Sequence, residues 1–181
     1  GPGFIDIHCH ASVKDEAFDN PEGVANFHKS HGTTSMLLTL YRDYTHKQML
    51  EFIDKVKLAK KLCNNIVGVH LEGPYLNAKT GAGIATAKEM LPKKQDYIEL
   101  VNSGLIKNWT CAPELEGIEE FIRDISKTGT TVAIGHSYAS YNQVEKAYES
   151  GARLVLPNAV YEYPEKEQKL NPLTTDTALI F

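Results

Sequence analysis

The stretch MLLTL at residues 36–40 and the stretch TVAIG at residues 131–135 decide the fold class. Both are apolar at most successive positions, instead of alternating between apolar and polar residues. Because successive strand residues point to opposite faces of a sheet, such runs predict strands that are covered on both faces. Strands of this kind are typical of parallel sheets, whose faces are covered by helices or by a barrel interior.

Outward from these two stretches, short apolar runs alternate with longer amphipathic ones. We expect strands at residues 4–8, 33–40, 66–71, 109–112, 131–135 and 153–156, and helices at residues 22–30, 46–63, 94–102, 118–127 and 141–150. Strict alternation predicts βαβ units with right-handed crossovers. The expected class is α/β, an incomplete TIM-type (β/α)8 barrel of about six βα units, because a complete barrel usually needs ~250 residues. We assign residues 1–160 to this barrel and residues 161–181 to a polar loop or tail.

The composition of the 181 residues excludes several classes of protein. With 42% hydrophobic and 23% charged residues, the chain is expected to form a globular core. A net charge of −4 and the absence of a basic cluster argue against a nucleic-acid partner. No apolar run approaches the ~20 residues of a membrane span, and no signal peptide is visible. Three widely spaced cysteines fit neither a disulfide framework nor a CxxC motif, which indicates a cytoplasmic location.

Histidines and carboxylates follow the expected strands at their carboxyl ends, the edge where barrel enzymes place their active sites. His8 and His10 end the first strand, Glu72 ends the third and His136 follows the fifth. Each residue alone has a structural explanation, such as a cap or a hydrogen-bonded core histidine. Four of them on one sheet edge favour a metal site, and imidazole with carboxylate suits zinc or iron.

Other residues near these motifs receive no ligand role. Cys9, between the two histidines, should point to the opposite face and pack between strand and helix. Three further histidines lie on or beside expected helices, where a solvated side chain is the default: His28, His31 and His46.

Six motifs carry a resemblance to a known family. They read PGFIDIHCH at 2–10, SHGTTS at 30–35, HLEGPYLN at 70–77, APE at 112–114, IGHS at 134–137 and the glycine-alanine pair that begins the next strand. In this order and spacing, they resemble the N-acetylglucosamine-6-phosphate deacetylases of the amidohydrolase superfamily. The resemblance implies a metal-dependent (β/α)8 barrel that removes acetate from the sugar amide. The implied partner is an amino-sugar phosphate, a small molecule, and the implied cofactor is a divalent metal, zinc or iron.

The resemblance also implies roles for single residues. Glu72 and His136 match family metal ligands, and His8 and His10 match the pair that holds a second metal in some members. Three further residues match positions that line the sugar or meet its phosphate: Ala82, Asn158 and Ala159.

The chain departs from the family pattern in several places. Residues 153–157 read RLVLP and lack the histidine ligand expected there, and the phosphate-pairing arginine is also absent. The family aspartate lies on a later strand, and Asp176 follows Asn158 too closely to match it. We therefore assign no catalytic residue within this chain.

Three hypotheses follow from this pattern. The first is a truncated or divergent deacetylase; the second is a catalytically incomplete fragment or pseudoenzyme that binds a sugar phosphate or a partner chain. The third, a different amidohydrolase beginning with HxH, is disfavoured by the HLEGP motif. Because an incomplete barrel exposes open strand edges, we expect a homo-oligomer.

Overall fold

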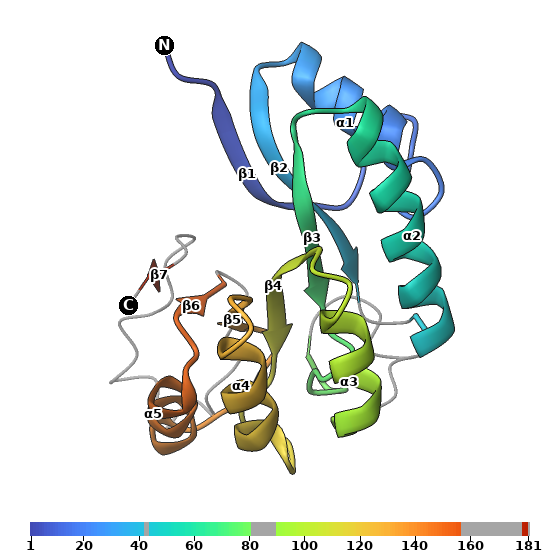
Figure 1. Cartoon of the computed structure of the whole chain (residues 1–181). Helices are drawn as coiled ribbons and strands as arrows, with labels where there is room; N and C mark the ends of the chain where they lie inside the picture. The colour runs from blue at the N-terminus through green and yellow to red at the C-terminus, as the bar shows by residue number, and fades with distance from the viewer. Residues whose placement is uncertain (42–43, 81–89, 157–178, 181) are drawn as a thin grey trace.

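The computed structural model describes residues 1–41, 44–80, 90–156 and 179–180, and Figure 1 shows its course. Strands and helices alternate along the chain. In order they are β1 (Phe4–Cys9), α1 (Pro21–Ser30), β2 (Thr33–Tyr41), α2 (His46–Leu62), β3 (Ile66–Glu72), α3 (Lys94–Val101), β4 (Ile106–Cys111), α4 (Ile118–Ser126), β5 (Thr131–Ile134), α5 (Tyr141–Ser150), β6 (Leu154–Val155) and β7 (Leu179–Ile180).

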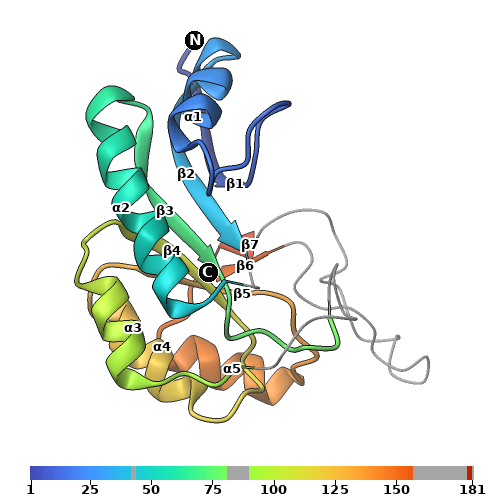
Figure 2. The same cartoon turned by 90° about the vertical axis from the view of Figure 1, so that its right-hand side faces the viewer.

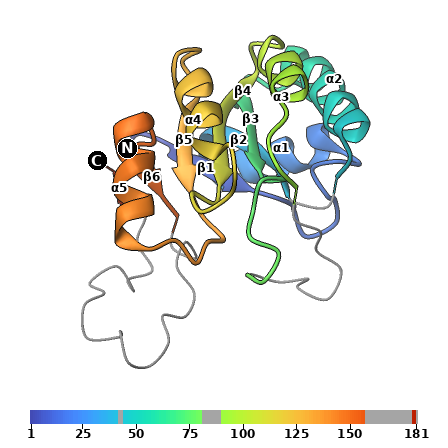
Figure 3. The same cartoon turned by 90° about the horizontal axis from the view of Figure 1, so that it is seen from below.

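The strands form one sheet in the order β1-β2-β3-β4-β5-β6-β7. Each pair from β1 to β6 is parallel, and β7 pairs with β6 in the antiparallel direction. Figure 3 shows α5, α4, α3 and α2 arranged in an arc along one side of these strands. Six parallel strands with outer helices make an incomplete α/β barrel, which confirms the expected fold class.

Local signals explain where the helices begin and end. Thr45 caps α2 in a capping box: the Gln48 backbone N–H donates to the Thr45 hydroxyl, and the Thr45 backbone N–H donates to the Gln48 side chain. The predicted apolar stripe of α2 is buried against the sheet: Met49, Phe52, Ile53, Val56 and Ala59. Gly32, just after α1, has a φ of 99°, a conformation that glycine adopts without strain. Figure 2 shows α2 running alongside β3.

Aromatic side chains form the centre of the core beneath α3 and α4. Trp109 of β4 is fully buried, and its ring centroid lies 5.9 Å from that of Tyr75 and 5.1 Å from that of Phe121. The Trp109 indole N–H donates to the Gly73 carbonyl oxygen at 2.8 Å. This bond ties the loop that follows β3 to the core.

The fourth strand begins three residues earlier than predicted. We expected it at residues 109–112, but it begins at Ile106, which pairs with Val69 of β3. The polar residues Lys107 and Asn108 interrupt the apolar run, so the sequence did not predict this part of the strand, although Asn108 is buried. The predicted boundary between residues 160 and 161 lies outside the described residues. Within the described part of the chain, none of the helices has both the length and the apolar character needed to cross a bilayer.

Candidate metal centre

Three imidazoles converge on one carboxylate at the carboxyl edge of the sheet. Glu72, the last residue of β3, has a side chain that is only 10% exposed. Its Oε2 atom lies 3.0 Å from His10 Nε2 and 3.2 Å from His8 Nε2, and its Oε1 atom lies 2.6 Å from His136 Nε2. The structure therefore brings together all four residues that the sequence predicted for a metal site.

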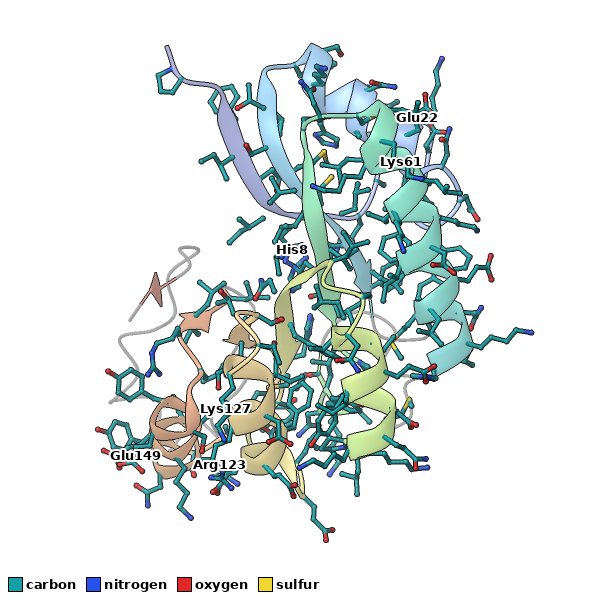
Figure 4. The ribbon with its side chains drawn as sticks, in the orientation of Figure 1. His8, Glu22, Lys61, Arg123, Lys127 and Glu149 are labelled. Carbon is teal, nitrogen blue, oxygen red and sulfur yellow. The ribbon has the colours of Figure 1, made fainter. Side chains whose placement is uncertain are left out.

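The end of β1 delivers two of these imidazoles to the same point. His8 lies on β1, His10 directly follows it, and their Nε2 atoms are 2.9 Å apart. Figure 4 shows the His8 side chain beside β3, on the side away from α2. Ligand atoms of His8, His10 and Glu72 all lie within 4.8 Å of one another, which is close enough to share one cation.

The third imidazole comes from the loop after β5. His136 has a φ of 50°, which is rare for a residue with a side chain. Its Nδ1 atom is buried and has no hydrogen-bond partner among the described residues. The orientation of this ring is therefore set by its backbone and by its contact with Glu72.

The close contacts change the titration of the two charged partners. Burial alone would raise the pKa of Glu72, but hydrogen bonds from His10, His136 and His8 hold that pKa far below its usual range. Burial also works to lower the pKa of His10, but the hydrogen bond and negative charge of Glu72 raise it above its usual value. The carboxylate is therefore ionised at neutral pH and available as a ligand.

A buried histidine supports the centre from within the sheet. His70 is fully buried, with its Nε2 2.7 Å from the Thr110 hydroxyl and its Nδ1 3.4 Å from the Thr39 hydroxyl. Its ring centroid is 4.8 Å from that of His8, in an edge-to-face arrangement. Burial and the charge of His8 lower the pKa of His70 to about 3, so this imidazole is neutral at pH 7. His70 opens the HLEGPYLN motif but received no predicted role, because the local sequence does not show which histidines the fold buries.

Glu114, in the APE motif at the end of the fourth predicted strand, received no predicted role of its own. Its carboxylate accepts hydrogen bonds from Asn77 Nδ2 at 2.8 Å, from the Ser137 hydroxyl at 2.6 Å and from the Tyr138 backbone N–H at 2.7 Å. These donors belong to the loops after β3 and β5. Glu114 therefore links the loop that carries His136 to two neighbouring loops.

The predicted environment of His28 was wrong. His28 is half-buried, and its Nε2 lies 2.9 Å from the Ala11 carbonyl oxygen and 3.1 Å from Cys9 Sγ. The reason is that α1 packs over the turn that follows β1. Cys9 itself is 6% exposed and belongs to the core, as its predicted direction implies. Burial, together with the charge of Asp6, raises the pKa of this thiol to about 11.

The remaining predicted positions have different outcomes. His31 is exposed, as predicted. His46 is half-buried, like His28, and its Nε2 lies 2.8 Å from Glu99 Oε2. The three positions that the family resemblance assigned to substrate lie outside the described residues: Ala82, Asn158 and Ala159.

A hollow of about 520 Å³ lies on the other side of the molecule, between the carboxyl ends of α4 and α5. Arg123, Lys127 and Glu149 line it and are labelled in Figure 4. Cations at the carboxyl end of a helix complement its dipole. This interaction accounts for the basic residues in the hollow, so we assign no ligand to it.

Comparison with curated proteins identifies relatives along most of the chain. No protein-family model matches the sequence. The N-acetylglucosamine-6-phosphate deacetylase of Caenorhabditis elegans is 32% identical over 197 residues, covering 98% of this chain and 47% of the relative. The protein of the same name from Bos taurus is 30% identical over 194 residues, with the same two coverages. That of Lysinibacillus sphaericus is 29% identical over 168 residues, covering 83% of this chain and 41% of the relative.

Solved structures of the same enzyme share the fold. The crystal structure from Mycobacterium smegmatis matches with a TM-score of 0.79 and 25% identity, over 91% of this chain and 49% of that chain. The structure from Thermotoga maritima matches with a TM-score of 0.77 and 26% identity, over 91% of this chain and 46% of that chain. The chain is therefore a homologue of the N-acetylglucosamine-6-phosphate deacetylases, and it is similar to them in sequence and fold over somewhat less than half of their length.

Proposed function

We propose that this chain forms part of a metal-dependent hydrolase that removes acetate from N-acetylglucosamine 6-phosphate to leave glucosamine 6-phosphate. The observation that carries the proposal is the convergence of His8, His10 and His136 on Glu72. The names of the curated relatives supply the substrate, an amino-sugar phosphate.

The chemistry of the donor set fits a divalent cation. Imidazole nitrogen and carboxylate oxygen are the ligands that zinc and iron accept in catalytic sites. Two ring nitrogens within 3.2 Å of a single carboxylate oxygen place several donor atoms around one point. A cation bound by the two ring nitrogens and the carboxylate oxygen would account for their close approach. No proton would then be needed between each nitrogen and the oxygen.

Each residue has a defined task in this proposal. Glu72 supplies negative charge to the site, and its ionised form also orients His8 and His10. His136 closes the site from the third side through Nε2. A divalent ion in such a site, when bound, supplies the positive charge that acidifies water and polarises an amide carbonyl.

A second candidate function is binding of metal and sugar phosphate without hydrolysis. It is favoured by the composition of β6 and its flanks, because residues 153–156 read RLVL and offer no imidazole at the next strand edge. The ligand set seen in the described residues then comes from β1, β3 and the loop after β5.

Zinc binding and acetate release, measured on the same preparation, separate these candidates. The purified chain would be freed of metal, titrated with zinc or ferrous ion and assayed with N-acetylglucosamine 6-phosphate. Glu72→Gln tests the centre, and Glu116→Gln, at an exposed position, is the matched control. The first candidate predicts tight binding and turnover that are lost only in Glu72→Gln. Binding without turnover in the wild-type chain would favour the second candidate, and a folded chain that binds neither ion would overturn both.

Two further features are part of the proposal. The edge strand β1 leaves Phe4 and Ile5 70% and 76% exposed, which supports a homo-oligomer that light scattering would detect. The three cysteines are buried and unpaired, which supports a reducing, cytoplasmic location.

A further inference from the structure

The backbone at His136 needs support from its surroundings. His136 has a positive φ, and a non-glycine residue persists in this strained conformation only when neighbouring contacts determine it. Ligand histidines are normally oriented by a hydrogen bond from the ring nitrogen that does not face the metal. At His136 that nitrogen, Nδ1, has no partner among the described residues. Apart from the contact of Nε2 with Glu72, the orientation of this ring therefore depends on the backbone of its loop.

The contacts of Glu114 provide this support. Its Oε1 atom accepts from the Tyr138 backbone N–H and from Asn77 Nδ2, and its Oε2 atom accepts from the Ser137 hydroxyl. Ser137 is fully buried, and its hydroxyl oxygen in turn accepts from the Ala139 backbone N–H at 2.8 Å. The two residues that follow His136 are thus both bonded to one carboxylate.

The loop after β3 completes the support on the other side. The Asn77 backbone N–H donates to the His136 carbonyl oxygen at 3.1 Å, while the Asn77 side chain bonds to Glu114. The three loops that follow β3, β4 and β5 are therefore linked through Glu114. The link includes the His136 carbonyl and both residues that follow it.

We propose that Glu114 is a positioning residue that fixes the orientation of the His136 imidazole by holding the backbone of its loop. This inference rests on the proposed metal-binding function of the centre. Glu114 acts through Ser137, Tyr138 and Asn77, and we assign it no contact with the metal or the substrate. It takes the place of the hydrogen bond that Nδ1 does not make within the described residues.

The test compares Glu114→Gln with the exposed control Glu116→Gln. Zinc affinity of the chain would be measured by competition with a chromophoric chelator, and the imidazole signals of the metal-free chain would be recorded by NMR. We expect Glu114→Gln to weaken zinc binding by ~10–100-fold, the range for partners that orient metal ligands. We also expect it to shift the signals of His136 more than those of His8 and His10. A purely structural role would lower the unfolding midpoint and leave the zinc affinity of the folded molecules unchanged.

A milder variant keeps the proposal testable if Glu114→Gln does not fold. Ser137→Ala removes one of the three hydrogen bonds to Glu114 and should weaken zinc binding by a smaller factor in the same direction. Zinc affinity within twofold of the wild-type chain in the folded variants would overturn the positioning role alone. A wild-type chain that binds no zinc would overturn the proposed function, and with it this inference.

Discussion

Replacing Trp109 with phenylalanine should destabilise the fold and loosen the candidate metal centre together. Trp109 is fully buried, and its indole N–H donates to the carbonyl of Gly73, the residue that follows Glu72. Losing that donor leaves a buried carbonyl unpaired, which costs ~1–3 kcal/mol. The smaller ring also leaves a cavity beside Tyr75 and Phe121, which adds ~1–2 kcal/mol.

The expected loss of unfolding free energy is therefore about 3 kcal/mol, or a fall in Tm of roughly 6–12 °C for a chain of this length. Urea denaturation followed by circular dichroism would measure it; tryptophan fluorescence cannot be used, since Trp109 is the only tryptophan in the sequence. Tyr141→Phe is the control, because Tyr141 is 72% exposed and its change should stay within ~0.5 kcal/mol. A loss below ~1 kcal/mol in Trp109→Phe would refute the argument that the bond to Gly73 anchors this loop.

Three further outcomes are expected. The pKa of Glu72 is lowered in the folded chain, so its stabilising contribution is present above the ordinary carboxylate pKa and is lost as the pH falls below that value. The pKa of His10 is raised, so its stabilising contribution is present below pH 6.5 and is lost at higher pH. Urea midpoints of the metal-free chain, measured between pH 3 and 8, should show both losses. If the midpoint of Glu72→Gln changed with pH as steeply as that of the wild-type chain, the pKa shifts would not arise from the contacts of Glu72. Gly135→Ala places a Cβ 2.6 Å from Thr110 Cγ2, next to His70, and should cost ~1–3 kcal/mol in thermal unfolding; an unchanged Tm would show that Thr110 moves freely. Burial raises the pKa of all three thiols, those of Cys9, Cys63 and Cys111. A chromogenic disulfide reagent at pH 8 should therefore react slowly with the native chain and rapidly after denaturation. Fast labelling of the native chain would contradict the burial of these thiols.

The order of the elements could be predicted from the sequence because it depends on local rules, and the gathering of the residues of the candidate metal centre follows from that order. The apolar stripe of residues 46–63 reports a helix face directly. Once the strands are known to be parallel, His8, His10 and Glu72 are expected at the same edge of the sheet, because the carboxyl ends of parallel strands lie at one edge. The family motifs indicated the same residues independently.

Other features depend on partners that are distant in sequence. The first residues of β4 join the sheet because Ile106 pairs with Val69, although the polar residues after Ile106 break the local pattern. The half-buried environment of His28 exists because α1 packs over the turn after β1. Neither effect is visible in a window of neighbouring residues.

The sequence by itself determined which residues reach the candidate centre, and the tertiary structure decided how they are held there. Glu114 lies in the APE motif, but no local pattern reveals its three hydrogen-bond donors, which lie 23 to 37 residues away along the chain. The same holds for His70, whose two hydroxyl partners come from the strands on either side of β3. The positions of strands and helices along the chain and the periodicity of their side chains follow from interactions between near neighbours. The orientation of a buried polar group is instead set by the donors and acceptors that the folded chain brings around it.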